Sequence, residues 1–121
     1  TTAFIIAGHD RDEIERARGA VKQQIAFYAS TRTYAGVLEA HGWGDTCYRL
    51  NEKAAQGDWT GMASLITDEM LQVYAVEGTY DDIPDLLKKK YHGVLDRLGF
   101  YAPVRPGTDD ALWSRLIAAC R

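Results

Sequence analysis

Hydrophobic and polar positions follow two different patterns along this chain. Residues 3–7, Ala-Phe-Ile-Ile-Ala, form a continuous apolar run that ends at Gly8, which is typical of a strand buried on both faces. A capping-box pattern follows, with Asp10 and Glu13 at its two key positions. An amphipathic helix is predicted over residues 11–29, because apolar side chains then recur at helical spacing. These side chains are Ile14, Ala17, Val21, Ile25 and Tyr28.

The same helical spacing, with its interruptions, predicts five more helices and one more strand. Short helices are expected over residues 34–40 and 45–56, each followed by glycine. A helix capped by Asp58 continues until Gly78 stops it, and the next begins near Asp82 so that Pro84 falls in its first turn. Residues 94–103 are the second strand candidate, and a last helix follows Thr108 or Asp109.

Two short strands cannot form a sheet that buries both of its faces, although both segments have the composition of buried strands. Either the chain oligomerises through its sheet, or upstream strands are missing. The chain begins without methionine and already inside an apolar run, so we expect it to be a segment cut from a longer protein. A (β/α)₈ barrel would supply the missing strands.

Composition and charge exclude several classes of function. A chain of 121 residues is one domain at most. Its net charge of −3, from 14 basic and 17 acidic residues, offers no basic face for nucleic acid. No apolar run is long enough to span a bilayer, and neither the two cysteines nor the three histidines have metal-ligand spacing. We therefore expect a cytoplasmic protein without metal, nucleic acid or membrane partners.

Three stretches of the chain resemble the C-terminal third of the bacterial luciferase-like oxidoreductases, in particular the branch that uses the deazaflavin coenzyme F-420. They are "AFIIAGHDRDEIERARGAVKQQIAFYASTRTYAGVLEAHGWGD", "LITDEMLQVYAVEGTYDDI" and "GVLDRLGFYAP". The family has a strand, an acidic capped helix and an aromatic segment in this order, then a "GTPEEV" helix start and a final strand. Here that helix start is "GTYDDI", with Tyr80 where proline is usual.

The resemblance implies an α/β fold: the last two β/α units and a helical insertion from a TIM barrel. In isolation this chain would be mostly α-helical with two short parallel strands. Residues 1–121 would form one segment: a strand at 3–8, a helical insertion at 10–77, and a helix-strand-helix at 78–121 that closes the barrel. The whole protein would transfer a hydride between coenzyme F-420 and a small organic substrate, as a homo-oligomer whose cofactor is bound mainly upstream.

Barrel active sites lie at the carboxyl ends of the strands, which places His9 and Tyr101 among the candidates for substrate contact. His9 would donate or accept a hydrogen bond, although a solvated loop histidine has the same sequence. Gly78 and Thr79 begin a helix whose free N–H groups suit a cofactor phosphate. Asp81 and Asp82 place negative charge there, so a self-capped helix is the alternative.

The aromatic segment behind the first helix admits two interpretations. Arg32, Tyr34 and Trp43 would line the substrate pocket if the insertion returns to the rim, with Arg32 holding a planar acceptor. Otherwise these side chains belong to a packing joint between helices.

No pair of a nucleophile and a base is present, so no catalytic residue is assigned and this chain alone is not expected to be active. The alternatives are an FMN-dependent monooxygenase of the same fold and a non-catalytic helical assembly domain.

Overall fold

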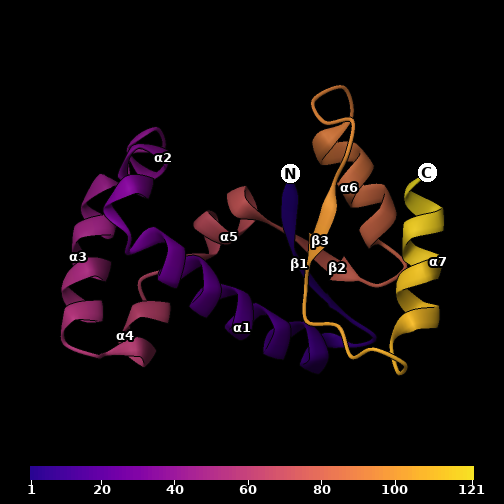
Figure 1. Ribbon diagram of the computed structural model, residues 1–121, viewed down its shortest axis with the longest axis horizontal. Helices are drawn as coiled ribbons and strands as arrows, with labels where there is room; N and C mark the ends of the chain where they lie inside the picture. Colours follow the sequence, from indigo (N-terminus) through magenta and orange to yellow (C-terminus); the bar gives the residue numbers. More distant parts are fainter. The chain divides into compact units, whose positions relative to one another are not determined.

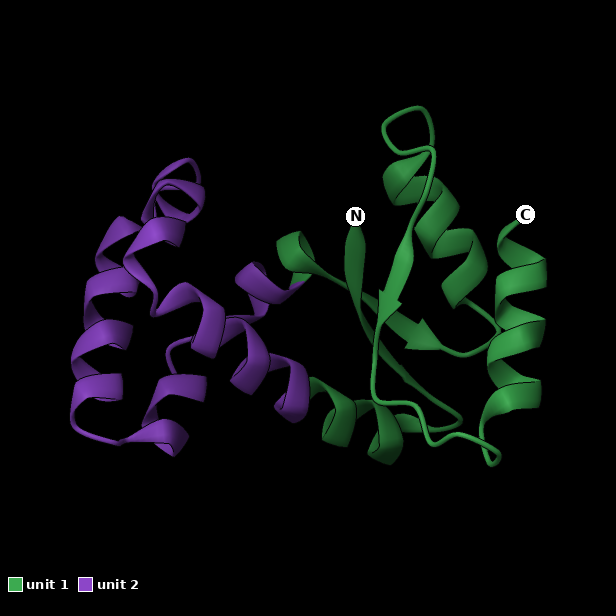
Figure 2. Ribbon diagram, in the orientation of Figure 1, with its two compact units in different colours: residues 1–18, 72–121 green, residues 19–71 purple.

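The computed structural model describes residues 1–121, and the chain divides into two compact units (Figures 1 and 2). The first unit consists of residues 1–18 and 72–121, and the second of residues 19–71. The first holds all the strands, whereas the second is entirely helical and loop.

A parallel sheet of three strands forms the centre of the first unit. The strands are β1 (Thr2–Gly8), β2 (Ala75–Thr79) and β3 (Gly99–Tyr101), in the order β2-β1-β3. Phe4 to Gly8 lie opposite Ala75 to Thr79, and Thr2 to Phe4 lie opposite Gly99 to Tyr101. The central strand β1 therefore pairs with β3 alone at its beginning, with both neighbours at Phe4, and with β2 alone at its end.

Helices α6 (Ile83–Tyr91) and α7 (Asp110–Cys120) pack against each other beside this sheet (Figure 1). Pro84 falls in the first turn of α6, as the sequence predicts, where its missing N–H costs no hydrogen bond. Burial of apolar side chains from the sheet and α6 stabilises the unit. The core cluster consists of Ala3, Ile5, Val76, Ile83 and Leu87.

The second unit begins within α1 (Arg11–Ala29) and continues through η1 (Arg32–Tyr34), α2 (Ala35–Glu39), α3 (Gly44–Ala55), α4 (Trp59–Ala63) and the start of α5 (Asp68–Tyr74). The chain leaves α1 at Ser30, whose hydroxyl donates to the carbonyl of Phe27 at 2.7 Å. The amide of Asn51 in turn donates to the carbonyl of Ser30 at 3.1 Å. These bonds satisfy polar groups where the helix ends and α3 packs nearby.

The fold class is confirmed, because the chain is mostly helical with short parallel strands, but the number of strands was wrong. Residues 75–79 form β2, whereas the sequence predicted one helix from Trp59 to Gly78. That helix is broken after Ala63, and Thr67 starts α5 by accepting a hydrogen bond from the backbone of Met70 at 3.2 Å. The helical insertion expected over 10–77 therefore ends in a strand.

The strand order also differs from a simple expectation. Consecutive strands of a (β/α)₈ barrel are neighbours, which would place β2 between β1 and β3. Here β1 lies in the middle, and β3 pairs with the edge of β1 that β2 does not use. The second predicted strand is also shorter than residues 94–103, because only Gly99–Tyr101 pair.

Candidate functional site

The loops that follow the three strands meet at one edge of the first unit. Because the strands are parallel, their carboxyl ends point the same way, and polar side chains after Gly8, Thr79 and Tyr101 gather there. The backbone N–H of Tyr80 donates to the carbonyl of Gly8 at 3.2 Å, which joins the first two loops. We call this edge the rim, made of His9, Glu13, Tyr80, Arg105 and Asp109.

An aromatic contact is the central feature of the rim. The rings of His9 and Tyr80 lie edge to face with centroids 4.8 Å apart. Tyr80 also meets Trp113 of α7 at 6.2 Å and nearly perpendicular, and Trp113 meets Phe100 of β3 at 5.6 Å. Such edge-to-face pairs are favourable for aromatic rings. Tyr80 is therefore held between an exposed histidine and the buried indole.

The start of α1 fixes the position of His9. Its backbone N–H donates to Oε2 of Glu13 at 2.7 Å, while the N–H of Glu13 donates to Oδ1 of Asp10 at 2.9 Å. The predicted capping interaction at Asp10 is thus confirmed. Gly8 permits this tight junction, since a Cβ there would lie 2.5 Å from the Cβ of Glu13.

The phenol of Tyr80 stays protonated at neutral pH. Burial raises its pKa above the ordinary value, and the carboxylates of Glu13 and Asp109 raise the pKa further against the opposing effect of Arg105. Asp109 itself is paired, because it accepts from Nε and Nη2 of Arg105 at 3.2 and 3.0 Å. The rim therefore offers Tyr80 as a neutral hydrogen-bond donor beside His9.

The predicted cofactor residues Gly78 and Thr79 lie beside the rim, but the donors of Thr79 are already engaged and the space beside Gly78 is occupied. Both the N–H and the hydroxyl of Thr79 donate to Oδ2 of Asp82, at 3.2 and 2.6 Å. A Cβ on Gly78 would lie 2.8 Å from Leu86 and 3.2 Å from Asp82, so this space is filled. A phosphate would have to displace the carboxylate of Asp82. These two residues do not fit a cofactor phosphate, and the geometry is that of a self-capped helix.

Tyr101 lies within the sheet rather than among the rim side chains. Its ring packs edge-on against Phe4, its partner in the register of β1 and β3, with centroids 5.0 Å apart. The tyrosine is 38% exposed, so one side of the ring remains accessible.

Arg32, Tyr34 and Trp43 all belong to the second unit, where Tyr34 and Trp43 each contact another aromatic ring. The rings of Tyr28 and Tyr34 lie 6.0 Å apart, and Trp43 stacks on His41 at 4.9 Å and 22°. Burial raises the pKa of the Cys47 thiol, and Arg32 lowers it by a smaller amount. As pocket residues, these three stay a prediction.

Sequence reasoning missed Tyr80, Arg105 and Asp109 as members of the rim, and Trp113 as the aromatic contact of Tyr80. One signal was present: Tyr80 stands where the resembling family has proline. The other three follow β3, and nothing in their spacing shows that the last loop packs beside Tyr80. No group of three or more metal-ligating side chains is found.

Comparison with known proteins decides the family. The sequence pattern described as luciferase-like monooxygenase matches residues 1–97. The chain belongs to this family. None of its helices combines the length and apolar character needed to cross a membrane.

The curated relatives that the chain matches are much longer than the chain itself. Uncharacterized proteins of Mycobacterium tuberculosis and Mycobacterium bovis are each 44% identical over 95 residues, which cover 78% of this chain and 28% of the relative. A 5,10-methylenetetrahydromethanopterin reductase of Archaeoglobus fulgidus is 28% identical over 111 residues, or 88% of this chain and 33% of the reductase. The chain thus spans about a third of the length of these relatives. No solved structure matches it significantly.

Proposed function

We propose that this luciferase-like chain is part of an oxidoreductase that transfers a hydride between coenzyme F-420 and a small organic substrate. The observation that carries the proposal is the similarity to the archaeal reductase over 88% of the chain. The rim supports it, since a neutral tyrosine donor and a histidine lie together at the edge where parallel α/β folds bind ligands.

Within this proposal His9 and Tyr80 bind and orient the substrate. The phenol of Tyr80 donates to a carbonyl or alcohol oxygen, because its raised pKa keeps the proton in place. His9 supplies a second polar contact from an exposed loop. The deazaflavin would supply the hydride chemistry from sites outside this chain, because both donors of Thr79 are engaged by Asp82. Arg32, Tyr34 and Trp43 remain candidates for the substrate wall, and homo-oligomer formation is part of the same proposal.

The first experiment measures the intact mass of the polypeptide in its native host, followed by binding of F-420 and FMN to that polypeptide. We expect a mass near that of the longer relatives and binding of F-420. Binding of FMN alone would support the flavin monooxygenase that the family description suggests. A native chain of 13.5 kDa that binds neither cofactor would refute both enzymes in favour of an assembly domain.

The rim is tested by His9→Ala and Tyr80→Phe in the cofactor-binding polypeptide. Each should lower kcat/KM about tenfold to a hundredfold, because a positioned donor to the reacting oxygen is lost. Tyr48→Phe is the matched control, since Tyr48 is 53% exposed on α3 in the other unit. Equal activity of Tyr80→Phe and Tyr48→Phe would remove Tyr80 from the proposed site.

A further inference from the structure

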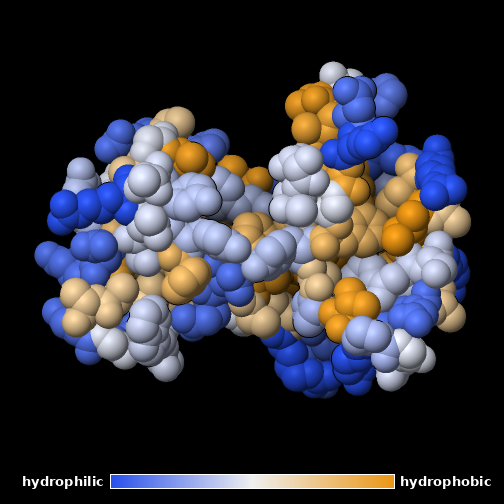
Figure 3. Space-filling view, viewed as in Figure 1, coloured by the Kyte–Doolittle hydropathy of each residue, from blue (hydrophilic) through white to orange (hydrophobic).

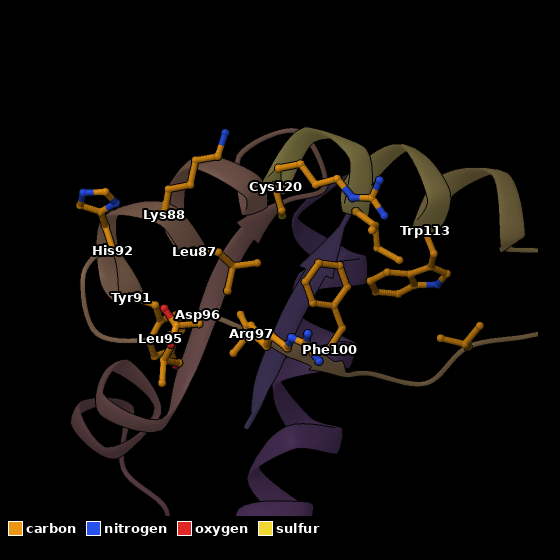
Figure 4. Close-up of a pocket in the computed structure, with 15 residues that line it drawn as sticks. Leu87, Lys88, Tyr91, His92, Leu95, Asp96, Arg97, Phe100, Trp113 and Cys120 are labelled. Carbon is orange, nitrogen blue, oxygen red and sulfur yellow. The ribbon is translucent and has the colours of Figure 1, made fainter.

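A separate apolar groove of about 890 Å³ opens in the first unit between α6, α7 and β3 (Figure 4). Its floor is formed mainly by Leu87, Leu98, Phe100, Trp113, Ile117 and Cys120. Leu87 and Trp113 are buried, whereas Ile117 is 47% exposed at the margin. His9, Tyr80 and Thr79 do not line it, so the groove is distinct from the rim. Its volume lies in the range of small-molecule sites.

The charged residues around the groove are mostly cationic. Lys88, Arg97 and Arg121 line it together with the imidazole of His92, against the single acidic side chain of Asp96. Lys88 and His92 point away from the floor, but the guanidinium of Arg97 lies beside Phe100 within the groove (Figure 4). Arg97 forms no ion pair and its side chain is exposed. A cation thus lies unneutralised against apolar surface.

The groove is also extended along the helices. Its lining residues on α7 extend from Trp113 to Cys120, which corresponds to about 10 Å along a helix, and Arg121 follows directly. Lys88 of α6 and Cys120 of α7 both line the groove, and the two helices pack against each other. Figure 3 shows hydrophobic and hydrophilic residues side by side over the loop between α6 and β3 and beside α7.

We propose that this groove binds a monomeric amphiphilic carboxylate, with its apolar body on Leu87, Phe100 and Trp113 and its carboxylate on Arg97. Charge complementarity selects the head group, since a guanidinium pairs with a carboxylate in a two-bonded geometry. The apolar floor of the groove favours a ligand with an apolar body, because the burial of apolar surface is favourable in proportion to its area. The proposal does not depend on the oxidoreductase function, and it concerns the 121-residue chain, in which β3 lies beside β1 and forms one side of the groove.

Cys120 provides a direct reporter of occupancy. It is half-buried in the groove, whereas Cys47 is fully buried, so a thiol reagent should modify Cys120 selectively. The reaction is run at mildly alkaline pH, since burial raises the pKa of the Cys120 thiol. Dodecanoate, below its micelle concentration, should slow the modification in a saturable way. Cys120→Ser should abolish the fast reaction and confirm the assignment.

Three comparisons define the chemistry. Butanoate and the neutral dodecanol should protect at least tenfold less well than dodecanoate, because each lacks one half of the recognised ligand. Arg97→Gln should weaken protection by dodecanoate about tenfold, through loss of a charge-assisted pair. Lys89→Gln on α6 is the matched control, since Lys89 is exposed and does not line the groove, and it should leave protection unchanged.

Binding to the folded chain should also raise the melting temperature with dodecanoate concentration. Lack of saturable protection, or equal protection in Arg97→Gln and the unchanged protein, would overturn the proposal. A falling melting temperature would overturn it as well, because it would indicate unfolding by a detergent. Protection by anionic phospholipid vesicles, with none by monomeric dodecanoate, would overturn it in favour of a membrane surface.

Discussion

Lys90 shows how one side chain can hold the junction of two elements. Its Nζ donates to the carbonyls of Gln72, Val73 and Ala75 at 2.9, 2.8 and 2.8 Å, where α5 ends and β2 begins. The last carbonyls of a helix have no partner within the helix, so the half-buried ammonium of Lys90 satisfies several of them together. This contact explains how α5 can end directly before β2 begins, without a glycine at the junction.

Replacing Lys90 by methionine should therefore destabilise the chain by about 1–3 kcal/mol, since charged hydrogen bonds are lost and carbonyls are left unsatisfied. Urea unfolding measures the effect. Lys89→Met is the control, because Lys89 is exposed on the same helix and should change stability by no more than about 0.5 kcal/mol. Equal unfolding midpoints for the two variants would contradict this role of Lys90.

A second residue makes stability depend on pH. The hydrogen bond from Lys53 at 2.7 Å, and then the one from the backbone of Gly61, hold the pKa of Asp58 below its usual value. The folded pKa lies below the unfolded one, so the stabilisation is present above the unfolded pKa and is lost as pH falls through the folded pKa. Asp58→Asn keeps the cap of α4 but cannot titrate. Its unfolding midpoint should fall less than that of the unchanged chain between about pH 5 and pH 2. Parallel pH profiles would contradict the assignment.

At the scale of elements, the sequence predicts those that depend on local signals. The capping pattern at Asp10, the spacing of α1 and the position of Pro84 in α6 are all confirmed. β2 was missed because Val73 and Val76 continue the helical spacing of α5, and only pairing with Phe4 to Gly8 makes residues 75–79 extended. Rim members after β3 were missed for the same reason: their contacts depend on tertiary packing.

The junction of β1 and α1 permits a test at this scale. A side chain at Gly8 would lie 2.5 Å from the Cβ of Glu13 and 2.8 Å from the backbone nitrogen of Ile14. Gly8→Ala should therefore cost about 1–3 kcal/mol of stability and displace His9 from Tyr80. Gly19→Ala within α1 is the control, with nothing within 4 Å, and should stabilise by about 1 kcal/mol. If both variants were destabilised, the effect would arise from α1 in general and not from the junction of β1 and α1.

The whole molecule has a strand order that its relatives' length helps to explain. In a closed barrel β1 has a neighbour on each side, and β3 would follow β2. In this chain the second edge of β1 is taken by β3, which pairs through only Thr2 to Phe4. A short strand on an otherwise open edge covers groups that would pair with other strands. The order β2-β1-β3 is therefore consistent with a sheet that uses its own last strand where a longer protein supplies another.

This explanation predicts different strand neighbours in two polypeptides. In the 121-residue chain, NMR should detect backbone proximity between Ala3 and Phe100, which lie opposite each other in the parallel register. In a polypeptide of the relatives' length, a strand ahead of β1 would compete for that edge, so the contact should disappear and proximity between β2 and β3 should replace it. The pairing of Ile5 with Val76 should persist in both and serves as the internal control. Detection of the Ala3–Phe100 contact in the longer polypeptide would show that β3 belongs beside β1, and the barrel interpretation of this sheet would then be wrong.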